Sequence, residues 1–339
     1  MNIRAARLLA ILVLPMLLSA CAPKLQPLGP VVTTPAFGAD RLVMDDGVGL
    51  PLRHWPAEGK TKAVVLAIHG LNDYSHAFEE PAADWAKLGI ETYAFDQRGF
   101  GETPYHGLWP GDRRMVADLK AAAQLLRQRN RDLPFFLLGE SMGGAVVMSA
   151  AADKDPPPAD GLILVAPAVW SRENLGPVAT GALWFFAHIV PWYTLDGRGL
   201  HIEPSDNRDM LEKLFRDPLV IKATRIDTVY GLVGLMDRAW AASPRMPART
   251  LVLYGAHEEV IDDTAAAAML RRLPRGPLGP RIAIYPQGYH MLLRDLNADI
   301  VRRDVASWIL DPADPLPSGA EAEARKILEL PKVGLAAGS

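Results

Sequence analysis

The stretch that decides the fold is Phe135-Phe136-Leu137-Leu138-Gly139-Glu140-Ser141-Met142-Gly143-Gly144, which is followed by the helix-forming residues 145–152. A short apolar run, a Gly-x-Ser-x-Gly motif and a helical segment in this order predict a strand, a sharp turn and a helix. Glycines on both sides of the serine suit such a turn, because a side chain at either position would be crowded. The turn would expose the Ser141 hydroxyl above the strand, close to the N–H groups that begin the helix. The motif therefore predicts a nucleophilic serine.

Apolar runs of strand length recur on both sides of this motif and alternate with helix-like stretches. Runs without polar alternation predict strands that are buried on both faces, and their alternation with helices predicts a doubly wound, mostly parallel sheet of the α/β class. The expected strands are residues 64–68, 92–95, 135–138, 162–165, 251–254 and 282–285. The expected helices are residues 78–87, 113–129, 143–153, 263–272 and 300–309.

The alternation stops at about residues 169–249, where we find no clear strand. This segment is predicted to be a helical cap, inserted over the carboxyl edge of the sheet, where open α/β sheets bind ligands. Its aromatic residues could line a pocket for an acyl chain or touch a bilayer, or they could simply form the packed interior of the cap. They include Trp170, Trp184, Phe185, Phe186, Trp192, Tyr193 and Trp240.

A nucleophilic serine needs a base and an acid, which in such a fold follow the serine in the order acid, then histidine. Of the eight histidines, only His290 lies in the loop after the last expected strand. The loop after the preceding strand holds four candidate acids. Glu258 has the best spacing from the strand end and Glu259 is next, whereas Asp262 and Asp263 look like caps of the following helix.

An oxyanion would need two backbone donors, and the sequence offers one at each of two strand ends. The N–H of Met142 begins the helix after the serine, and the N–H of Leu71 follows the strand that ends at Ile68. In the second loop Gly70 would let the main chain approach a substrate, and His69 would be structural. We find no ligand cluster for a metal, and no cofactor is implied.

These motifs together resemble the monoacylglycerol lipase and lysophospholipase branch of the α/β-hydrolases, also called the serine aminopeptidase-type hydrolases. The resemblance covers about residues 40–309 and is carried by His69-Gly70-Leu71, Ser75, Phe78, Phe95-Asp96-Gln97-Arg98-Gly99-Phe100-Gly101, Gly139–Gly144, Phe215-Arg216-Asp217-Pro218-Leu219 and Gly288-Tyr289-His290-Met291-Leu292. The family usually has aspartate where this chain has Glu258, so the longer side chain requires the loop to retreat slightly. In the family, Asp96 and Arg98 correspond to a structural pair that pins a loop beneath the site.

The resemblance implies hydrolysis of a carboxylic ester, with monoacylglycerol or lysophospholipid as the expected substrate, through an acyl-enzyme on Ser141. One alternative is a peptidase that removes N-terminal residues, which the same triad supports. The other is an inactive envelope lipoprotein with a binding role.

The N-terminus resembles a bacterial lipoprotein signal. Arg4 and Arg7 precede an apolar run over residues 8–18, which is too short to span a membrane, and Leu18-Ser19-Ala20-Cys21 ends it. We therefore expect a signal peptide at 1–20 and a lipid on Cys21, although an ordinary secretory signal with a chance cysteine would look similar. Alanine after the cysteine favours the periplasmic face of the outer membrane.

The remaining boundaries follow from composition. A proline-rich tether is expected at 21–38, the hydrolase domain at 39–312, and a C-terminal tail at 313–339 with a short amphipathic helix at 320–330. The net charge of −3 gives no basic excess that would point to nucleic acid.

Overall fold

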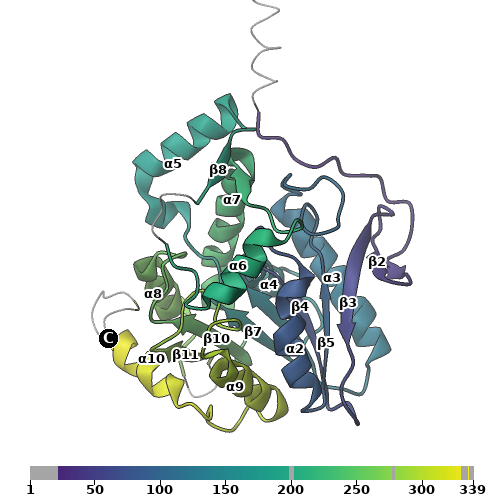
Figure 1. Cartoon of the computed structure of the whole chain (residues 1–339), viewed down its shortest axis with the longest axis vertical. Coiled ribbons are helices and arrows are strands. Elements are labelled where there is room, and N and C mark those ends of the chain that lie inside the picture. Colours follow the sequence, from purple (N-terminus) through teal and green to yellow (C-terminus); the bar gives the residue numbers. More distant parts are fainter. Residues whose placement is uncertain (1–21, 198–201, 277–278, 330–334, 336–339) are drawn as a thin grey trace, which may run out of the picture.

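The computed structural model of the chain describes residues 22–197, 202–276, 279–329 and 335. Its centre is a nine-stranded sheet in the order β1-β2-β3-β5-β4-β6-β7-β10-β11, shown in Figure 1. The strands from β5 to β11 are parallel, as the apolar runs predict. They are β4 (Ala63–Ile68), β5 (Ile90–Phe95), β6 (Phe135–Glu140), β7 (Gly161–Val165), β10 (Thr250–Gly255) and β11 (Arg281–Tyr285).

The register of β4 and β6 positions the site. All residues of both strands are buried, and Ile68 pairs with Gly139 at their carboxyl ends. Because parallel neighbours end at the same edge of a sheet, the loop after Ile68 and the turn after Gly139 lie side by side.

Three antiparallel strands extend the sheet at its N-terminal edge: β1 (Ala36–Phe37), β2 (Arg41–Val43) and β3 (Gly49–Trp55). The expected tether at 21–38 therefore ends inside the sheet, since Ala36 pairs with Val43. These strands are only partly buried, so they lack the continuous apolar runs that reveal the central strands.

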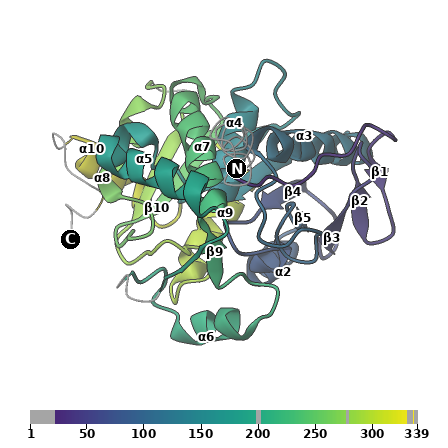
Figure 2. The same cartoon turned by 90° about the horizontal axis from the view of Figure 1, so that it is seen from above.

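Helices cover both faces of the sheet (Figures 1 and 2). One face packs against α3 (Asp112–Arg129), α4 (Met142–Ala151) and α8 (Asp263–Arg272). The other packs against η1 (Ser75–Phe78), α2 (Glu79–Ala86) and α9 (Ala298–Leu310), where Trp85 and Trp308 are almost fully buried. The five expected helices are present within a few residues of their expected ends.

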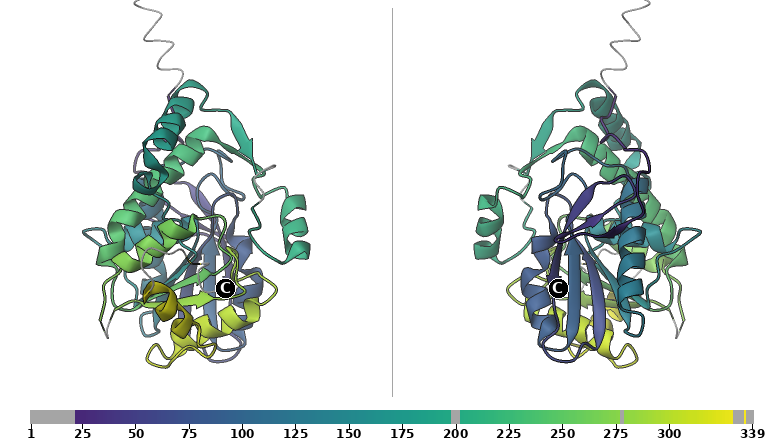
Figure 3. Two further views of the ribbon diagram at one scale, coloured as in Figure 1. Left: turned by 90° about the vertical axis from the view of Figure 1, so that its left-hand side faces the viewer. Right: turned by 90° about the vertical axis from the view of Figure 1, so that its right-hand side faces the viewer.

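The inserted segment contains α5 (Arg172–Ile189), β8 (Thr194–Asp196), α6 (Arg208–Arg216), β9 (Ala223–Arg225), α7 (Ile226–Ala242) and η2 (Ser243–Arg245). Figure 3 shows α5 rising above the sheet and α6 standing out to one side. The prediction of a helical cap holds for α5 and α6, but two details differ. A short antiparallel pair joins β8 to β9, and α7 packs on α4 as part of the main core.

The C-terminal segment also belongs to the domain. The short helix expected at 320–330 is α10 (Ala320–Glu329), and Ala320 and Ala324 are buried. Arg281 of β11 binds the Glu321 carboxylate with N···O distances of 2.7 and 2.8 Å. The predicted signal peptide and Cys21 lie outside the described residues. Within the part of the chain that is described, no helix is long and apolar enough to cross a membrane.

Candidate active site

Ser141 stands in a strained turn between β6 and α4. Its φ of 53° is a left-handed value that a non-glycine residue adopts only where its surroundings enforce it. Packing accounts for the flanking glycines: a Cβ on Gly139 would lie 2.4 Å from the carbonyl oxygen of Gly143. A Cβ on Gly143 would lie 2.0 Å from the carbonyl oxygen of Ile68. The turn thus has the nucleophile-elbow geometry that the sequence predicts.

Glu258 and His290 form a buried pair on the loops after β10 and β11. The His290 Nδ1–H donates to the Glu258 carboxylate, with distances of 2.8 and 3.0 Å to the two oxygens. One of these oxygens also accepts the N–H groups of Val260 and Ile261, at 2.8 and 2.9 Å. Burial by itself lowers the pKa of His290, but the charge and hydrogen bond of Glu258 outweigh it, so the net shift is upward.

The other candidate acids have different partners. Glu259 accepts the N–H of Glu203 at 2.8 Å. Asp262 caps α8 by accepting the N–H of Ala265, as expected, and Asp263 is the first residue of that helix. Of the four carboxylates considered, Glu258 is the one bonded to the histidine.

The acid loop and the histidine loop are packed backbone against backbone. The N–H of Ala256 donates to the carbonyl of Tyr285, and the N–H of His257 donates to the carbonyl of Gly288. A Cβ on Gly255 would lie only 2.1 Å from the Gly288 oxygen, so this contact requires glycine. Both loops therefore form one unit that holds Glu258 and His290 together.

A cavity of about 460 Å³ lies between this unit and the cap, and both Ser141 and His290 line it. Leu71 also lines the cavity, and a Cβ on Gly70 would lie 3.3 Å from the Ser141 Cβ. Met142 is buried and begins α4, so its N–H is the first of the helix beside the serine. The loop that carries Leu71 and the first turn of α4, which carries Met142, thus both lie beside Ser141. A second cavity of about 510 Å³, between β11, α9 and α10, includes neither Ser141 nor His290.

The cavity has an apolar side and a charged end. The apolar side comes mainly from the cap: Trp170, Leu175, Ala179, Leu183, Leu232, Val233 and Met236. At the charged end, Arg294 lies 2.8 Å from the Asp73 carboxylate and 3.3 Å from that of Glu140. Burial raises the pKa of Glu140, and Arg294 opposes that shift. Two buried atoms, Glu140 Oε1 and Arg294 Nε, have no hydrogen-bond partner among the described residues.

The sequence alone assigns no role to Asp73, Glu140 or Arg294. Two features of the sequence could have pointed to them as site residues: Glu140 occupies a variable position of the serine motif, and Arg294 follows the histidine by four residues. Only the folded chain brings them together, because Glu140 ends β6 while Asp73 and Arg294 come from two separate loops.

The residues expected to be structural are buried and do not line the cavity that holds Ser141. The Nε2 of His69 accepts the N–H of Gln97 at 2.9 Å, while its Nδ1–H donates to the Gly70 carbonyl. Asp96 accepts N–H groups from Ser75 and Glu102. The expected pairing of Asp96 with Arg98 differs in the structure.

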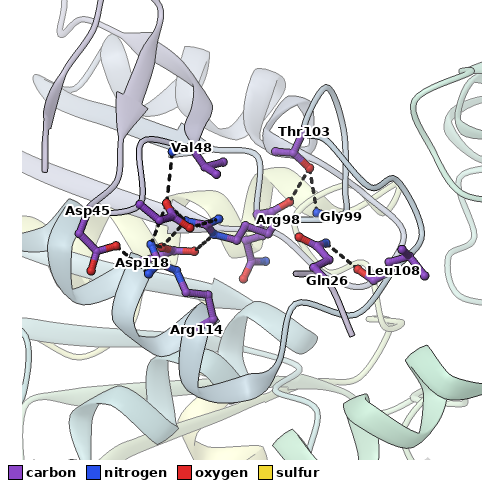
Figure 4. Close-up of polar contacts among 11 residues, drawn as sticks. Gln26, Asp45, Val48, Arg98, Gly99, Thr103, Leu108, Arg114 and Asp118 are labelled. Carbon is purple, nitrogen blue, oxygen red and sulfur yellow. Dashed lines mark hydrogen bonds and ion pairs between the residues drawn. The ribbon is translucent and has the colours of Figure 1, made fainter. Parts of the chain in front are cut away.

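Arg98 binds two other acids (Figure 4): its guanidinium lies 2.8 Å from the Asp46 carboxylate and 2.6 Å from that of Asp118. Asp46 lies in the turn between β2 and β3, and Asp118 lies in α3, so the sequence motif around Arg98 could not indicate either partner. Arg98 therefore joins the edge of the sheet to α3.

A strained serine after a central strand, with a buried histidine–carboxylate pair on the last two loops of a mostly parallel sheet, defines the α/β-hydrolase class. Within this class, the chain belongs to the serine aminopeptidase family S33, whose model matches residues 59–297.

Relatives of known name agree with this class. The monoglyceride lipase of Rattus norvegicus is 27% identical over 280 residues, which cover 79% of this chain and 89% of that protein. The monoacylglycerol lipase of Mycolicibacterium smegmatis is 23% identical, covering 78% and 94%. A soluble variant of the Saccharomyces cerevisiae monoglyceride lipase, solved with a substrate analogue, has a TM-score of 0.65 at 18% identity and covers 84% of this chain and 96% of that one. The chain is accordingly a serine ester hydrolase.

No group of three or more histidine, cysteine or acidic residues suited to holding a metal ion occurs within the described ranges.

Proposed function

We propose that this chain hydrolyses single-chain acyl esters, monoacylglycerol above all, with Ser141 as nucleophile, His290 as base and Glu258 as acid. The observation that carries the proposal is the lining of the cavity around Ser141, which is apolar on one side and charged at one end. An apolar wall suits an acyl chain, and the charged end beside the serine suits a small polar alcohol. The named relatives and the lysophospholipase resemblance point to the same class of substrate.

In the first step, His290 Nε2 takes the proton of the Ser141 hydroxyl as its oxygen attacks the ester carbonyl. The N–H groups of Leu71 and Met142 stabilise the oxyanion of the tetrahedral intermediate. Glu258 orients the imidazole and stabilises its protonated form. The protonated His290 then gives its proton to the leaving alcohol, which departs and leaves the acyl group on Ser141.

In the second step, water replaces the alcohol. His290 takes a proton from this water, whose oxygen attacks the acyl-enzyme, and then returns the proton to the Ser141 oxygen as the fatty acid leaves. The reaction needs no redox partner.

The polar end of the cavity supports an alcohol as the leaving group. Glu140 Oε1 and Arg294 Nε are buried without a hydrogen-bond partner among the residues that the structure describes, and leaving such atoms unpaired costs about 1–3 kcal/mol each. Hydroxyl groups both donate and accept, so a glycerol moiety could pair with both. An α-ammonium group fits less well, because Arg294 already stands beside both carboxylates. This disfavours the aminopeptidase alternative.

The test is labelling of the purified protein with a fluorophosphonate, together with hydrolysis of long-chain monoacylglycerol and of a short-chain soluble ester. We expect the wild type to be labelled and to cleave monoacylglycerol, and Ser141→Ala to do neither. Cleavage of short esters alone would reject the lipase assignment. A folded wild type that is not labelled would favour the binding role, which Ser141→Ala should leave intact.

For the location, we propose a bacterial cell envelope, with a lipid on Cys21 that anchors the domain to the periplasmic face of the outer membrane. The support is the pattern of residues 1–22. Palmitate labelling of the wild type and of Cys21→Ala tests it, and equal labelling of both would refute the anchor.

A further inference from the structure

Residues 24–26, which we call the N-terminal segment, lie in the expected tether but are docked on the domain. The N–H of Gln26 donates to the Trp109 carbonyl at 3.0 Å. The Gln26 side chain is buried and donates to the carbonyl of Leu108 at 2.7 Å (Figure 4). A Cβ on Gly99 would lie 2.6 Å from the Gln26 amide nitrogen, so the glycine leaves room for this side chain. The segment therefore occupies a fitted place on the loop after β5.

The same loop is packed against helix α7 of the inserted segment. Trp109 is only 2% exposed, and its ring lies on Gly231, where a Cβ would come within 2.3 Å of the indole. The hydroxyl of Thr228 donates to the carbonyl of Gly107 at 2.8 Å. The residue that binds the N-terminal segment thus also fixes the first half of α7.

A second contact joins the segment directly to α7. The N–H of Lys24 donates to the Asp227 carboxylate at 3.2 Å, and the Arg225 guanidinium lies 2.5 and 2.9 Å from the same carboxylate. The N–H of Asp227 donates to the carbonyl of Pro191. Asp227 is only 1% exposed, and a buried carboxylate is costly unless such partners satisfy it. This carboxylate therefore ties the N-terminal segment and β9 to the first turn of α7.

Helix α7 forms part of the apolar side of the catalytic cavity. Four of its residues line the cavity and follow Asp227 within about three helical turns: Val229, Leu232, Val233 and Met236. The reacting groups of Ser141 and His290, in contrast, stand on loops of the main sheet. The N-terminal segment consequently acts on the wall of the cavity and not on the groups that make and break bonds.

We propose that the N-terminal segment sets the position of α7, which makes Gln26 and Asp227 positioning residues for the acyl chain of the substrate. The segment precedes the part of the chain that matches the family model. The inference rests on the proposed function, because it assigns the apolar wall to an acyl chain. Binding strength grows with the apolar area that is buried, so a long chain depends on this wall more than a short one does. Displacement of α7 should therefore weaken the binding of long-chain esters selectively.

The test compares two changes at one exposed residue of the full chain. Lys24→Pro removes the backbone donor to Asp227, because proline has no N–H. Lys24→Ala is the matched control, since it removes the same side chain and keeps the N–H. Thermal unfolding verifies that both variants are folded.

The assay is hydrolysis of monodecanoylglycerol, below its critical micelle concentration, and of monobutyrylglycerol. For Lys24→Pro we expect KM on the decanoyl ester to rise at least about fivefold, with kcat within about twofold of the wild type. Its KM on the butyryl ester should stay within about twofold, because the short chain reaches little of the wall. Lys24→Ala should match the wild type on both esters.

Equal KM values of the two variants on the decanoyl ester would overturn the proposal. A loss of the same size on both esters would overturn it too, because general damage would then explain the effect. If the folded wild type cleaves neither ester, the proposed function fails, and binding of decyl glyceryl ether, which cannot be hydrolysed, decides the inference separately. Binding at least about fivefold weaker in Lys24→Pro than in Lys24→Ala would sustain it, and equal binding would reject it.

Discussion

Glu258→Gln probes how the acid controls His290. One carboxylate oxygen accepts the N–H groups of Val260 and Ile261, so the glutamine carbonyl is expected to keep that position. Its NH₂ group then faces His290 Nδ1, which now lies 2.8 Å from the second carboxylate oxygen. Nδ1 must accept this hydrogen bond, which puts the ring proton on Nε2, and a protonated Nε2 cannot take the proton of Ser141.

The expected cost follows from this wrong tautomer. In the Ser-His-Asp template the corresponding amide variant lowers kcat by about 10⁴. At 1.36 kcal/mol per factor of ten, the barrier rises by about 5.4 kcal/mol. The loss of stability should be smaller, about 1.5–3 kcal/mol for one hydrogen bond to a charged group. The assay is kcat on a soluble ester, with the free energy of unfolding from denaturant titration.

Glu259→Gln is the matched control, because its carboxylate binds the N–H of Glu203 and should leave kcat within about a factor of two. A folded Glu258→Gln enzyme whose kcat falls less than about tenfold would show that the tautomer argument is wrong.

Three further predictions concern pH, a buried charge and two glycines. Since only neutral imidazole can accept a proton, kcat/KM should rise as pH passes the raised pKa of His290; stability should show the opposite trend. The pairing of protonated His290 with Glu258 contributes its full stability below the unfolded histidine pKa of 6.5. This contribution is lost as pH rises through the higher pKa of the folded state. The difference in unfolding free energy between the wild type and His290→Gln should therefore shrink over that range. Arg294→Met leaves two buried carboxylates without their cation and should cost about 3–5 kcal/mol of stability, whereas a change near zero would mean that they are neutral. Gly143→Ala places a Cβ 2.0 Å from the carbonyl oxygen at the end of β4 and should abolish ester hydrolysis. Gly234→Ala lies in helix α7, where a Cβ has nothing within 4 Å, and should stabilise the protein by about 1 kcal/mol. Thermal unfolding and an esterase assay measure the two variants.

The central strands were predictable because burial on both faces leaves continuous apolar runs, as in β4 and β6. The edge was not. β3 is only partly buried, and β1 has two residues in a proline-rich stretch, so composition suggested a tether. Gln26 illustrates the same limit, since a polar residue becomes buried only because distant backbone carbonyls satisfy it.

Candidate site residues could be selected from the sequence where chain order and strand ends restrict the choice, as for Ser141 and His290. The choice between Glu258 and Glu259 depends on which carboxylate turns toward the ring, and adjacent residues differ there only in the fold. The charged end of the cavity was not predicted, because Arg294 and Asp73 are 221 positions apart in the sequence and indicate a site only once the fold pairs them.

The docking of the N-terminal segment also imposes an order of events. Lys24 and its partner Asp227 are separated by 203 residues. A chain made at 5–20 residues per second needs about 10–40 s to reach that partner after Lys24 has been added. The contact of Lys24, one of the first described residues to be synthesised, can thus form only after most of the domain has been made, whereas the contact of Gln26 with Leu108 needs only 82 further residues.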